Sequence, residues 1–321
     1  MAVYTEIGDD ELSAFVALYD IGKVLSCKGI AEGVENSNFL VTTEHGNFIL
    51  TLYERRVRPA DLPFFIALME HLAESGVACP TPLKGRDGRA LRELCGRPAA
   101  IVSFLPGMWP HRVLPFHCAA VGRALADLHR AGAGFALGRA NDLSVAGWRR
   151  LFEACRERAD EVSRGLAAEL GRELAELEEA WPRGLPAGII HADLFPDNVF
   201  FREREISGLI DFYFACTDFL AYDLAVCLNA WCFEADGSLN ITKSRLLIDG
   251  YRRGRQLEEA ELLALPLLAR GSALRFALTR LYDWLNQKEG ALVRPKDPLE
   301  FLRKSRFHRR VGSIDGYGVD P

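Results

Sequence analysis

The first hundred residues combine short apolar runs at strand spacing with two stretches at helical spacing. Residues 9–22 (DDELSAFVALYDIG) place apolar side chains at helical intervals behind an acidic start. Helical spacing returns at residues 61–76, which end on Gly76, a residue suited to a helix C-cap. Between these stretches, extended runs occupy residues 22–31, 36–43 and 47–54. The last two flank EHG, a connection typical of a β-hairpin.

Turn signals and one more apolar run complete this region. GRDG and CGRP mark turns, and AAIVSF at residues 99–104 predicts a buried strand. The resulting order is strand, strand, strand, helix, strand, strand. This order predicts a small antiparallel sheet with one helix against it.

Beyond residue 107 the pattern is mainly helical. Helical spacing covers residues 116–132 and 145–181, and it resumes from residue 219 to about residue 288. Only short runs between residues 188 and 212 have strand character. The Gly-rich end, residues 312–321, is expected to be poorly ordered.

These patterns predict an α+β chain with two lobes. We expect a β-rich lobe at residues 1–101, a short hinge at residues 102–107 and a larger helical lobe at residues 108–321. Clefts between lobes commonly house small-ligand chemistry. The hinge is therefore the first place to look for a site.

The segment HADLFPDNVFF, residues 191–201, concentrates polar groups immediately before an apolar strand. His191, Asp193 and Asn198 have the spacing H-x-D-x-x-x-x-N, and Asp211 ends an apolar run thirteen residues after Asn198. Phosphoryl transfer needs an acceptor for the hydroxyl proton, oxygen ligands for Mg²⁺ and positive charge near the phosphates. Asp193 can accept the proton, while Asn198 and Asp211 can bind the metal. A hairpin from residues 198–212 would bring these groups together.

The plain alternative is that DLFPDN is only a turn, because Asp, Pro and Asn all favour turns for local reasons. The correctly spaced Asp211 favours the catalytic interpretation. We expect Asp197 to brace the turn and His191 to serve as a structural hydrogen-bonding residue rather than a proton carrier.

HADLFPDNVFF followed by LIDFYFACTDFLAYDLA resembles the protein-kinase-like phosphotransferases that include aminoglycoside, choline and homoserine kinases. Within that group, EGVENSNFLVTTEHGNFILTLYE together with HADLFPDNV looks most like the bacterial homoserine kinases of the aminoglycoside-phosphotransferase-like type. The resemblance covers about residues 5–310. It implies a two-lobed protein-kinase-like fold, ATP and Mg²⁺ as cofactors, and L-homoserine as the alcohol that is phosphorylated. It also implies that Asp193 is the base, that Asn198 and Asp211 bind magnesium, and that Asp218 and Asp223 stabilise the larger lobe.

The predicted nucleotide site departs from that family pattern in two places. The loop CKGIAEGVENSNF lacks G-x-G-x-x-G, and the strand FILTLYE has Thr51 where related kinases carry a lysine or arginine. Lys28, Arg55 or Arg56 are the possible substitutes for that cation, and Glu70 on the next helix is either its partner or a surface residue. The residues predicted to contact ATP are Gly29, Gly33, Asn36, Ser37, Asn38, Ile49, Thr51, Ser103, Phe104 and Leu105.

For the acceptor, the stretch GSALRFALTRLYDWLNQ offers charges of both signs. Arg275, Arg280 and Asp283 suit a zwitterionic amino acid, since arginine pairs well with carboxylates. An internal Arg280–Asp283 ion pair is the plain alternative. Trp109 either lines the cleft or only packs. Choline, ethanolamine or an aminoglycoside remain alternative acceptors, and a non-catalytic kinase-like binding protein is a remote one.

Composition adds mainly exclusions. A net charge of −5 argues against a nucleic-acid partner, and no apolar run approaches the roughly 20 residues that span a bilayer. The N-terminal residues lack the pattern of a signal peptide, so we expect a cytoplasmic protein without a membrane partner. The eight cysteines show no C-x-x-C pair and are expected to be reduced thiols. The basic segment at residues 303–310 is expected to face solvent, and the sequence does not indicate an oligomeric state.

Overall fold

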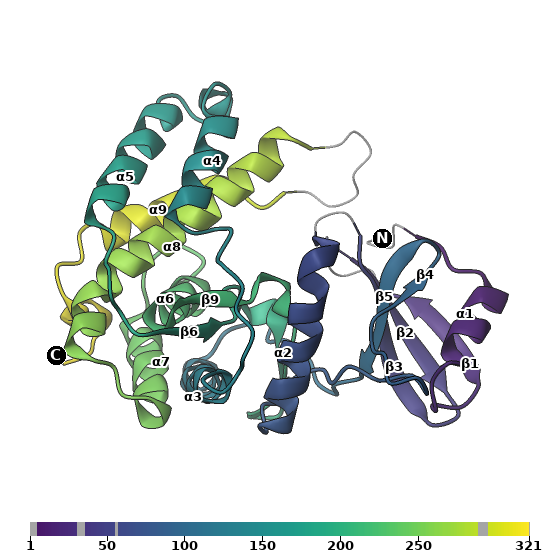
Figure 1. The fold of residues 1–321 in the computed structure, drawn as a ribbon. Coiled ribbons are helices and arrows are strands. Elements are labelled where there is room, and N and C mark those ends of the chain that lie inside the picture. The colour runs from purple at the N-terminus through teal and green to yellow at the C-terminus, as the bar shows by residue number, and fades with distance from the viewer. Residues whose placement is uncertain (1–4, 31–35, 55–56, 288–294, 321) are drawn as a thin grey trace.

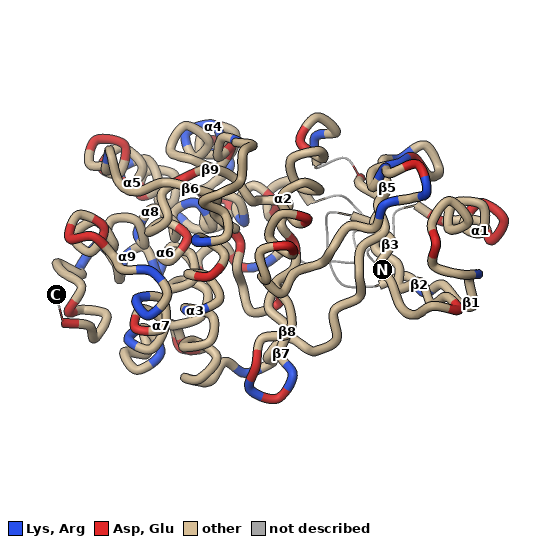
Figure 2. Tube along the Cα trace, turned by 60° about the horizontal axis from the view of Figure 1, so that its bottom comes forward, with Lys and Arg blue, Asp and Glu red and all other residues tan. Residues whose placement is uncertain are grey.

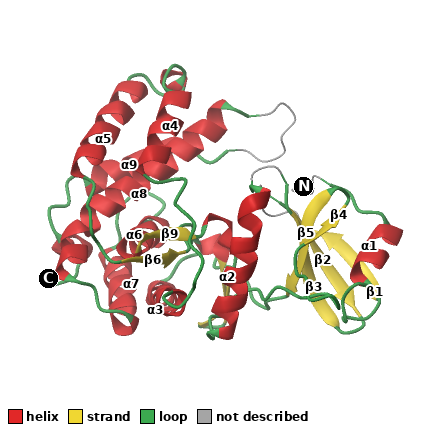
Figure 3. Cartoon of the chain, in the orientation of Figure 1, coloured by secondary structure: helices red, strands yellow, loops and turns green. Residues whose placement is uncertain are grey.

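The structure is a computed structural model that describes residues 5–30, 36–54, 57–287 and 295–320 (Figure 1). The chain forms a small β-rich lobe followed by a larger helical lobe, which confirms the predicted two-lobed α+β class. The longer strands gather in the small lobe, and helices dominate the other lobe (Figure 3). Acidic and basic residues are interspersed along both lobes (Figure 2).

The small lobe is built on a five-stranded antiparallel sheet in the order β1-β2-β3-β5-β4. Its hairpins follow the turn residues in the sequence. Thr43 pairs with Gly46 across the β2–β3 turn, and Cys95 and Gly96 connect β4 to β5 with φ of 51° and 68°. Positive φ at both central residues matches the right-handed twist of the strands. The strands are β1 (Val24–Gly29), β2 (Ser37–Thr43), β3 (Gly46–Leu52), β4 (Arg92–Leu94) and β5 (Arg97–Ser103).

The two faces of this sheet have different neighbours. One face buries Phe39, Val41, Leu50 and Leu52 in a small core together with apolar residues of α1 (Asp9–Val16). The opposite face carries Thr51, as strand alternation requires. Buried residues of this second face, such as Ala100, join the larger core.

Helix α2 (Leu62–Glu74) contributes its apolar side chains to the core of the larger lobe. Its start is held there by the Arg139 guanidinium, whose Nε lies 2.9 Å from Asp61 Oδ2. Its last turn is held by His71, whose Nε2 donates to the carbonyl of Ala131 at 2.9 Å. The helix therefore stands beside the helical lobe while its two chain ends connect to the sheet (Figure 1).

In its described residues, the larger lobe packs seven helices around two short antiparallel strand pairs, β6–β9 and β7–β8. Helices α3 and α7 approach closely because glycines face backbone on both sides: a Cβ on Gly122 would lie 2.1 Å from the Leu247 carbonyl oxygen, and one on Gly250 would lie 2.4 Å from that of Ala119. The helices are α3 (Pro115–Gly132), α4 (Val145–Cys155), α5 (Leu166–Ala180), α6 (Leu220–Trp231), α7 (Ile241–Gly254), α8 (Glu259–Leu285) and α9 (Pro298–His308). The strands are β6 (Ala187–Ile190), β7 (Val199–Arg202), β8 (Glu205–Leu209) and β9 (Cys216–Phe219).

Helix α8 corrects the expectation that no segment is apolar enough to cross a membrane. It has 27 residues, and the most apolar window has a mean hydropathy of 1.3. However, 72% of that window is buried inside the protein. The apolar character of α8 is therefore accounted for by its place in the core of the larger lobe.

Two further expectations were wrong. Strand β9 was not predicted, because CTDF is short and polar and becomes a strand only by pairing with β6. The C-terminal segment is ordered rather than frayed: Tyr317 is fully buried, its hydroxyl bonds His308 Nδ1 at 2.8 Å, and its carbonyl accepts from Ser244 Oγ at 2.7 Å.

The basic segment at residues 303–310 also faces inward in part. Lys304 and His308 are buried, whereas Arg303, Arg306 and Arg309 are exposed, as expected for one face of a helix. All eight cysteines are free thiols, as predicted, and six of them are buried.

Candidate active site

The carboxylate of Asp223 on α6 fixes the loop between β6 and β7, residues 191–198. Asp223 accepts the backbone N–H groups of His191 at 2.7 Å and Ala192 at 2.8 Å, and His129 Nε2 donates to it at 3.2 Å. Burial acts to raise the pKa of Asp223, but these hydrogen bonds and the neighbouring histidines hold it below its usual value. Ala192 is held at φ 63°, a conformation that non-glycine residues adopt only when their surroundings enforce it.

His191 ties this loop to the end of β8. Its Nε2 lies 3.0 Å from the carbonyl oxygen of Ile210 and must donate, while Nδ1 accepts the backbone N–H of Asp193 at 3.3 Å. Both nitrogens are thus used by the neutral ring. Burial lowers the pKa of His191, and the structure places it as a hydrogen-bonding residue of the loop.

Asp193 and Asn198 meet directly across the loop. Asn198 Nδ2 donates to the Asp193 carbonyl at 2.8 Å and to its carboxylate Oδ2 at 3.3 Å, so the amide oxygen lies on the other side of the amide group. The carbonyl of Asn198 accepts the N–H of Ile210 at 3.0 Å, which brings Asp211 to the same edge. Asp211 has φ 65°, a second strained conformation at this point.

Asp193 is partly buried, and desolvation raises the pKa of its carboxyl group to about 6. The Arg275 guanidinium acts in the opposite direction. Arg275 is buried, donates to the carbonyl of Ala192, and stacks on Phe276 with a distance of 4.3 Å to the ring centre. The structure therefore places this arginine under the loop, where it supports the backbone beside Asp193.

Thr51 on β3, where related kinases carry a lysine or arginine, lies in a region with several hydroxyl side chains. Thr51 Oγ1 donates to Asn38 Oδ1 at 2.8 Å on the neighbouring strand. The Tyr213 hydroxyl, from the turn after Asp211, donates to that of Tyr53 at 3.3 Å. Burial raises the pKa of Tyr213 well above its usual value, so these groups are neutral. Sequence analysis missed both tyrosines, although Tyr213 follows Asp211 by only two positions.

The other predicted nucleotide-loop side chains are held at the ends of the strands. Ser37 Oγ donates to Glu54 Oε1 at 2.8 Å, and Asn36 Oδ1 accepts the Glu54 N–H at 3.3 Å. Arg97 Nε lies 3.4 Å from the same carboxylate. Glu54 was not predicted; it organises this corner of the sheet. Contacts of these side chains with phosphate stay a prediction.

The other described residues predicted to lie near the nucleotide are found on β1, β3 and α2. Gly29 and Lys28 lie exposed on β1, and Ile49 shares the face of Thr51. Glu70 on α2 pairs with Lys84 at 3.1 Å. The calls on Gly33, Arg55 and Arg56 fall outside the described residues.

The connection between the lobes runs along the β7–β8 hairpin. Ser103 Oγ accepts the N–H of Thr81 at 2.9 Å, Phe104 is exposed, and Leu105 packs on Gly208, where an added Cβ would lie 2.6 Å from it. Met108 exchanges backbone hydrogen bonds with Phe201 at 3.1 and 2.9 Å. Residues 103–108 thus pass close to β7, the strand that begins immediately after Asn198. Trp109, next along the chain, stacks edge-on with His111 at 4.3 Å.

The predicted acceptor residues are spread apart. Arg280 pairs with Glu300 on α9 at 2.6 Å and also donates to the carbonyl of Asp297 at 3.2 Å. Asp283 lies near Cys155, whose pKa its charge helps to raise. Asp218 on β9 accepts Asn141 Nδ2 and the N–H of Phe219, both at 2.7 Å, in keeping with a structural residue.

Asp197 of the loop lies next to Lys296, a contact that was not predicted from the sequence. Lys296 Nζ is 3.5 Å from Asp197 Oδ2 and 6.0 Å from the ring centre of Phe195. Asp197 thus pairs with a residue 99 positions away, where the sequence had suggested that it braces the turn. Local patterns carry no signal for such a contact.

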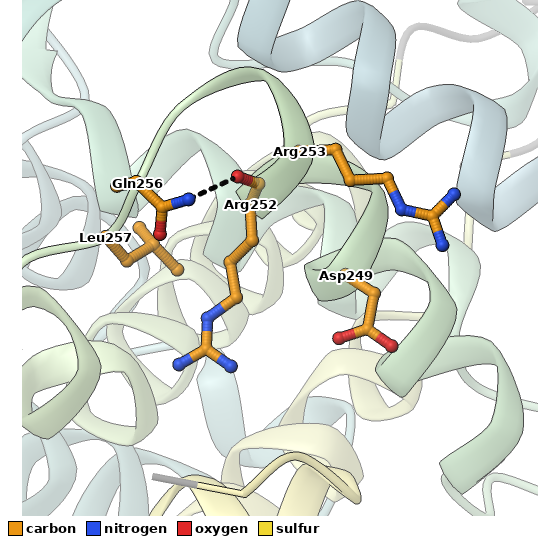
Figure 4. A pocket seen from close by; sticks show the side chains of 5 residues that line it. All are labelled: Asp249, Arg252, Arg253, Gln256 and Leu257. Atoms are coloured by element: carbon orange, nitrogen blue, oxygen red, sulfur yellow. Dashed lines mark hydrogen bonds between the residues drawn. The ribbon is translucent and has the colours of Figure 1, made fainter.

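A surface depression of about 440 Å³ lies elsewhere, over the end of α7 (Figure 4). In the close-up, Arg252 and Arg253 extend on either side of Asp249, and Gln256 Nε2 donates to the Arg252 carbonyl at 3.2 Å. None of the predicted site residues lines it.

The donor set can be tested against a divalent metal. Within the described ranges no group of three His, Cys, Asp or Glu side chains could hold a metal by itself. Mg²⁺ usually keeps several waters and takes one or two protein oxygens together with substrate phosphates. Asn198 and Asp211, brought to one edge of the loop, fit that requirement.

Comparison with solved structures shows which fold the chain has. An amicoumacin kinase in complex with AMP-PNP, Ca²⁺ and Ami superposes with a TM-score of 0.70 at 15% identity, over 94% of this chain and 92% of that one. A microcompartment-associated aminopropanol kinase gives a TM-score of 0.61 at 18% identity, over 93% of each chain. These two likenesses show that the chain has the fold of these kinases.

Sequence comparison gives the particular family. The model of the phosphotransferase enzyme family matches residues 26–257. Homoserine kinase of Paramagnetospirillum magneticum is 63% identical over the full length of both chains, and that of Bradyrhizobium diazoefficiens is 64% identical over all of this chain and 98% of the relative. The chain therefore belongs to the phosphotransferase enzyme family and, within it, to the homoserine kinases.

Proposed function

We propose that this chain transfers the γ-phosphoryl group of ATP to the side-chain hydroxyl of L-homoserine, giving O-phosphohomoserine, a step towards threonine. Full-length identity of 61–64% to relatives named homoserine kinase supports the acceptor. The observation that carries the chemistry is the Asp193–Asn198 contact, with Asp211 one residue beyond the backbone bond from Ile210 to Asn198.

In this proposal Asp193 orients the acceptor hydroxyl and takes its proton as the phosphoryl group moves. The hydrogen bond from Asn198 Nδ2 holds the carboxylate in place, and Asp223 holds the backbone beneath it. With a pKa of about 6, Asp193 is mostly ionised at neutral pH and still basic enough to accept a proton.

Asn198 and Asp211 would hold Mg²⁺ through their side-chain oxygens. When bound, the metal neutralises charge that develops between the β and γ phosphate oxygens. The hydroxyls at Thr51, Tyr53 and Tyr213 are neutral, so the described residues of this strand add no positive charge, and in this proposal the metal carries more of the phosphate binding.

The test is an ADP-release assay with homoserine, choline, ethanolamine and an aminoglycoside as acceptors. Homoserine should give the highest kcat/KM, and preference for any other acceptor would overturn the substrate assignment. Asp193→Asn should lower kcat by about 10²–10⁴-fold, the usual contribution of a positioned base, while ATP still binds. The exposed Asp127→Asn serves as the matched control, and equal turnover in Asp193→Asn and the parent would remove Asp193 from the mechanism.

A further inference from the structure

We propose that Lys296 and Asp197 form the receptor for the charged end of the acceptor: the Lys296 ammonium binds the α-carboxylate, and the Asp197 carboxylate binds the α-ammonium. This inference rests on the proposed function, because it concerns the same site and an amino-acid acceptor. It replaces Arg280 and Asp283 as the substrate-binding pair.

The two side chains form an exposed ion pair, and a ligand can bind between them. They lie 3.5 Å apart, and their side chains are 65% and 53% exposed. An exposed pair at this distance contributes little to folding stability. A zwitterion that binds between them gives each group a new partner of opposite charge, so the exchange leaves no charge uncompensated.

The pair adjoins the proposed base. Asp197 follows Asp193 by four residues in the same loop, and the charges of Asp197 and Lys296 both act on the Asp193 carboxyl group. In homoserine, only two methylene groups separate the hydroxyl oxygen from the α-carbon, which carries both the ammonium and the carboxylate group. A hydroxyl at Asp193 therefore requires its charged end to be bound by groups adjoining the loop.

The surroundings hold the backbone of Lys296 while leaving its side chain accessible. Asp297 caps α9 by accepting the N–H of Leu299 at 2.8 Å, and its carbonyl accepts from Arg280 at 3.2 Å. The Phe195 ring under Lys296 is itself packed on Phe276 at 4.8 Å. The receptor is thus built from a rigid loop and a capped helix start.

Among the residues that the structure describes, the arginines predicted to bind the acceptor are already engaged by the protein. The Arg275 guanidinium donates to the carbonyl of Ala192 and is buried. Arg280 pairs with Glu300, which also binds the buried Lys304 at 2.8 Å. To bind substrate, Arg275 would have to give up the Ala192 carbonyl, and Arg280 would have to give up Glu300. Lys296 would give up only its exposed ion pair with Asp197.

The experiment compares Lys296→Met, Lys296→Arg and Asp197→Asn with the parent enzyme. Arg306→Met, which removes an exposed cation of α9 that pairs with Glu169 on α5, is the matched control. Lys296→Met and Asp197→Asn should each raise the KM for homoserine by about 10–100-fold, with kcat within about threefold and the KM for ATP unchanged. Lys296→Arg should recover most of the loss, because the charge is kept.

Acceptor analogues separate the two roles. 4-Hydroxybutyrate has only the carboxylate and 3-aminopropan-1-ol has only the ammonium, and both are tested as competitors of homoserine. Lys296→Met should weaken inhibition by 4-hydroxybutyrate alone, and Asp197→Asn inhibition by 3-aminopropan-1-ol alone. Parental KM values in both variants, or equal losses for homoserine and ATP, would overturn the receptor. A parent enzyme that does not phosphorylate homoserine would instead refute the proposed function.

Discussion

Replacing Asp223 with asparagine tests how much the site depends on one buried carboxylate. In the parent, Oδ1 accepts the N–H of Ala192, and Oδ2 accepts that of His191 and the Nε2–H of His129. Asparagine keeps one acceptor oxygen but presents an NH₂ group on the other side. If the oxygen remains at Ala192, the His191 N–H faces a donor and loses its partner.

The magnitude follows from those bonds. Leaving a buried donor unsatisfied costs about 1–3 kcal/mol, and hydrogen bonds to a charged group are worth about 1.5–3 kcal/mol each. We therefore expect Asp223→Asn to lower the free energy of unfolding by about 2–4 kcal/mol. Ala192 also loses a constraint on its strained φ, and displacement of Asp193 by about 1 Å can cost roughly 10²-fold in turnover.

The assay is urea denaturation followed by fluorescence, combined with steady-state kinetics under conditions where the variant is fully folded. Asp127→Asn, in an exposed pair with Arg130, should stay within about 0.5 kcal/mol of the parent. An Asp223→Asn variant with parental stability and parental kcat would refute the role assigned to this carboxylate.

Three further outcomes are expected. Asp211→Ala should abolish the Mg²⁺-dependent part of nucleotide binding measured by calorimetry, and unchanged Mg-ATP affinity would count against its role as a ligand. Burial and the nearby Lys304 lower the pKa of His308 to about 3, so the unfolded chain takes up a proton first as the pH falls below 6.5. Stability should drop by about 2 kcal/mol between pH 6.5 and 5, and His308→Gln but not the exposed His45→Gln should flatten this slope. Gly122→Ala should destabilise by about 2 kcal/mol or more, because its Cβ would meet an α7 carbonyl at 2.1 Å, whereas Gly312→Ala, with nothing within 4 Å, should have little effect.

Local sequence patterns predicted the parts of the site that lie close together along the chain. Asp193 and Asn198 are five residues apart, and the β7–β8 hairpin that returns to Asp211 is also local. Strand alternation along β3 also separates Thr51 from Leu50 and Leu52, and the structure packs Leu50 and Leu52 with α1. These predictions needed only spacing and turn chemistry.

The unpredicted features depend on contacts between distant segments. Lys296 meets Asp197 only because α9 starts beside the loop, and Arg275 reaches Ala192 across 83 residues. Tyr317 is ordered by partners on α7 and α9, which outweigh the flexibility suggested by its Gly-rich neighbours. Composition describes a segment in isolation, and burial depends on what covers it.

The placement of α2 limits how the two lobes can move. Because its side chains belong to the larger core, the chain passes between sheet and helical lobe three times: from β3 into α2, from α2 back to the strands beside β5, and from β5 to α3. A lobe joined by one connection can rotate in any direction, whereas a lobe joined by three connections is restricted to a few rotations. Any rotation of the sheet and α1 relative to the larger lobe has to be compatible with all three connections.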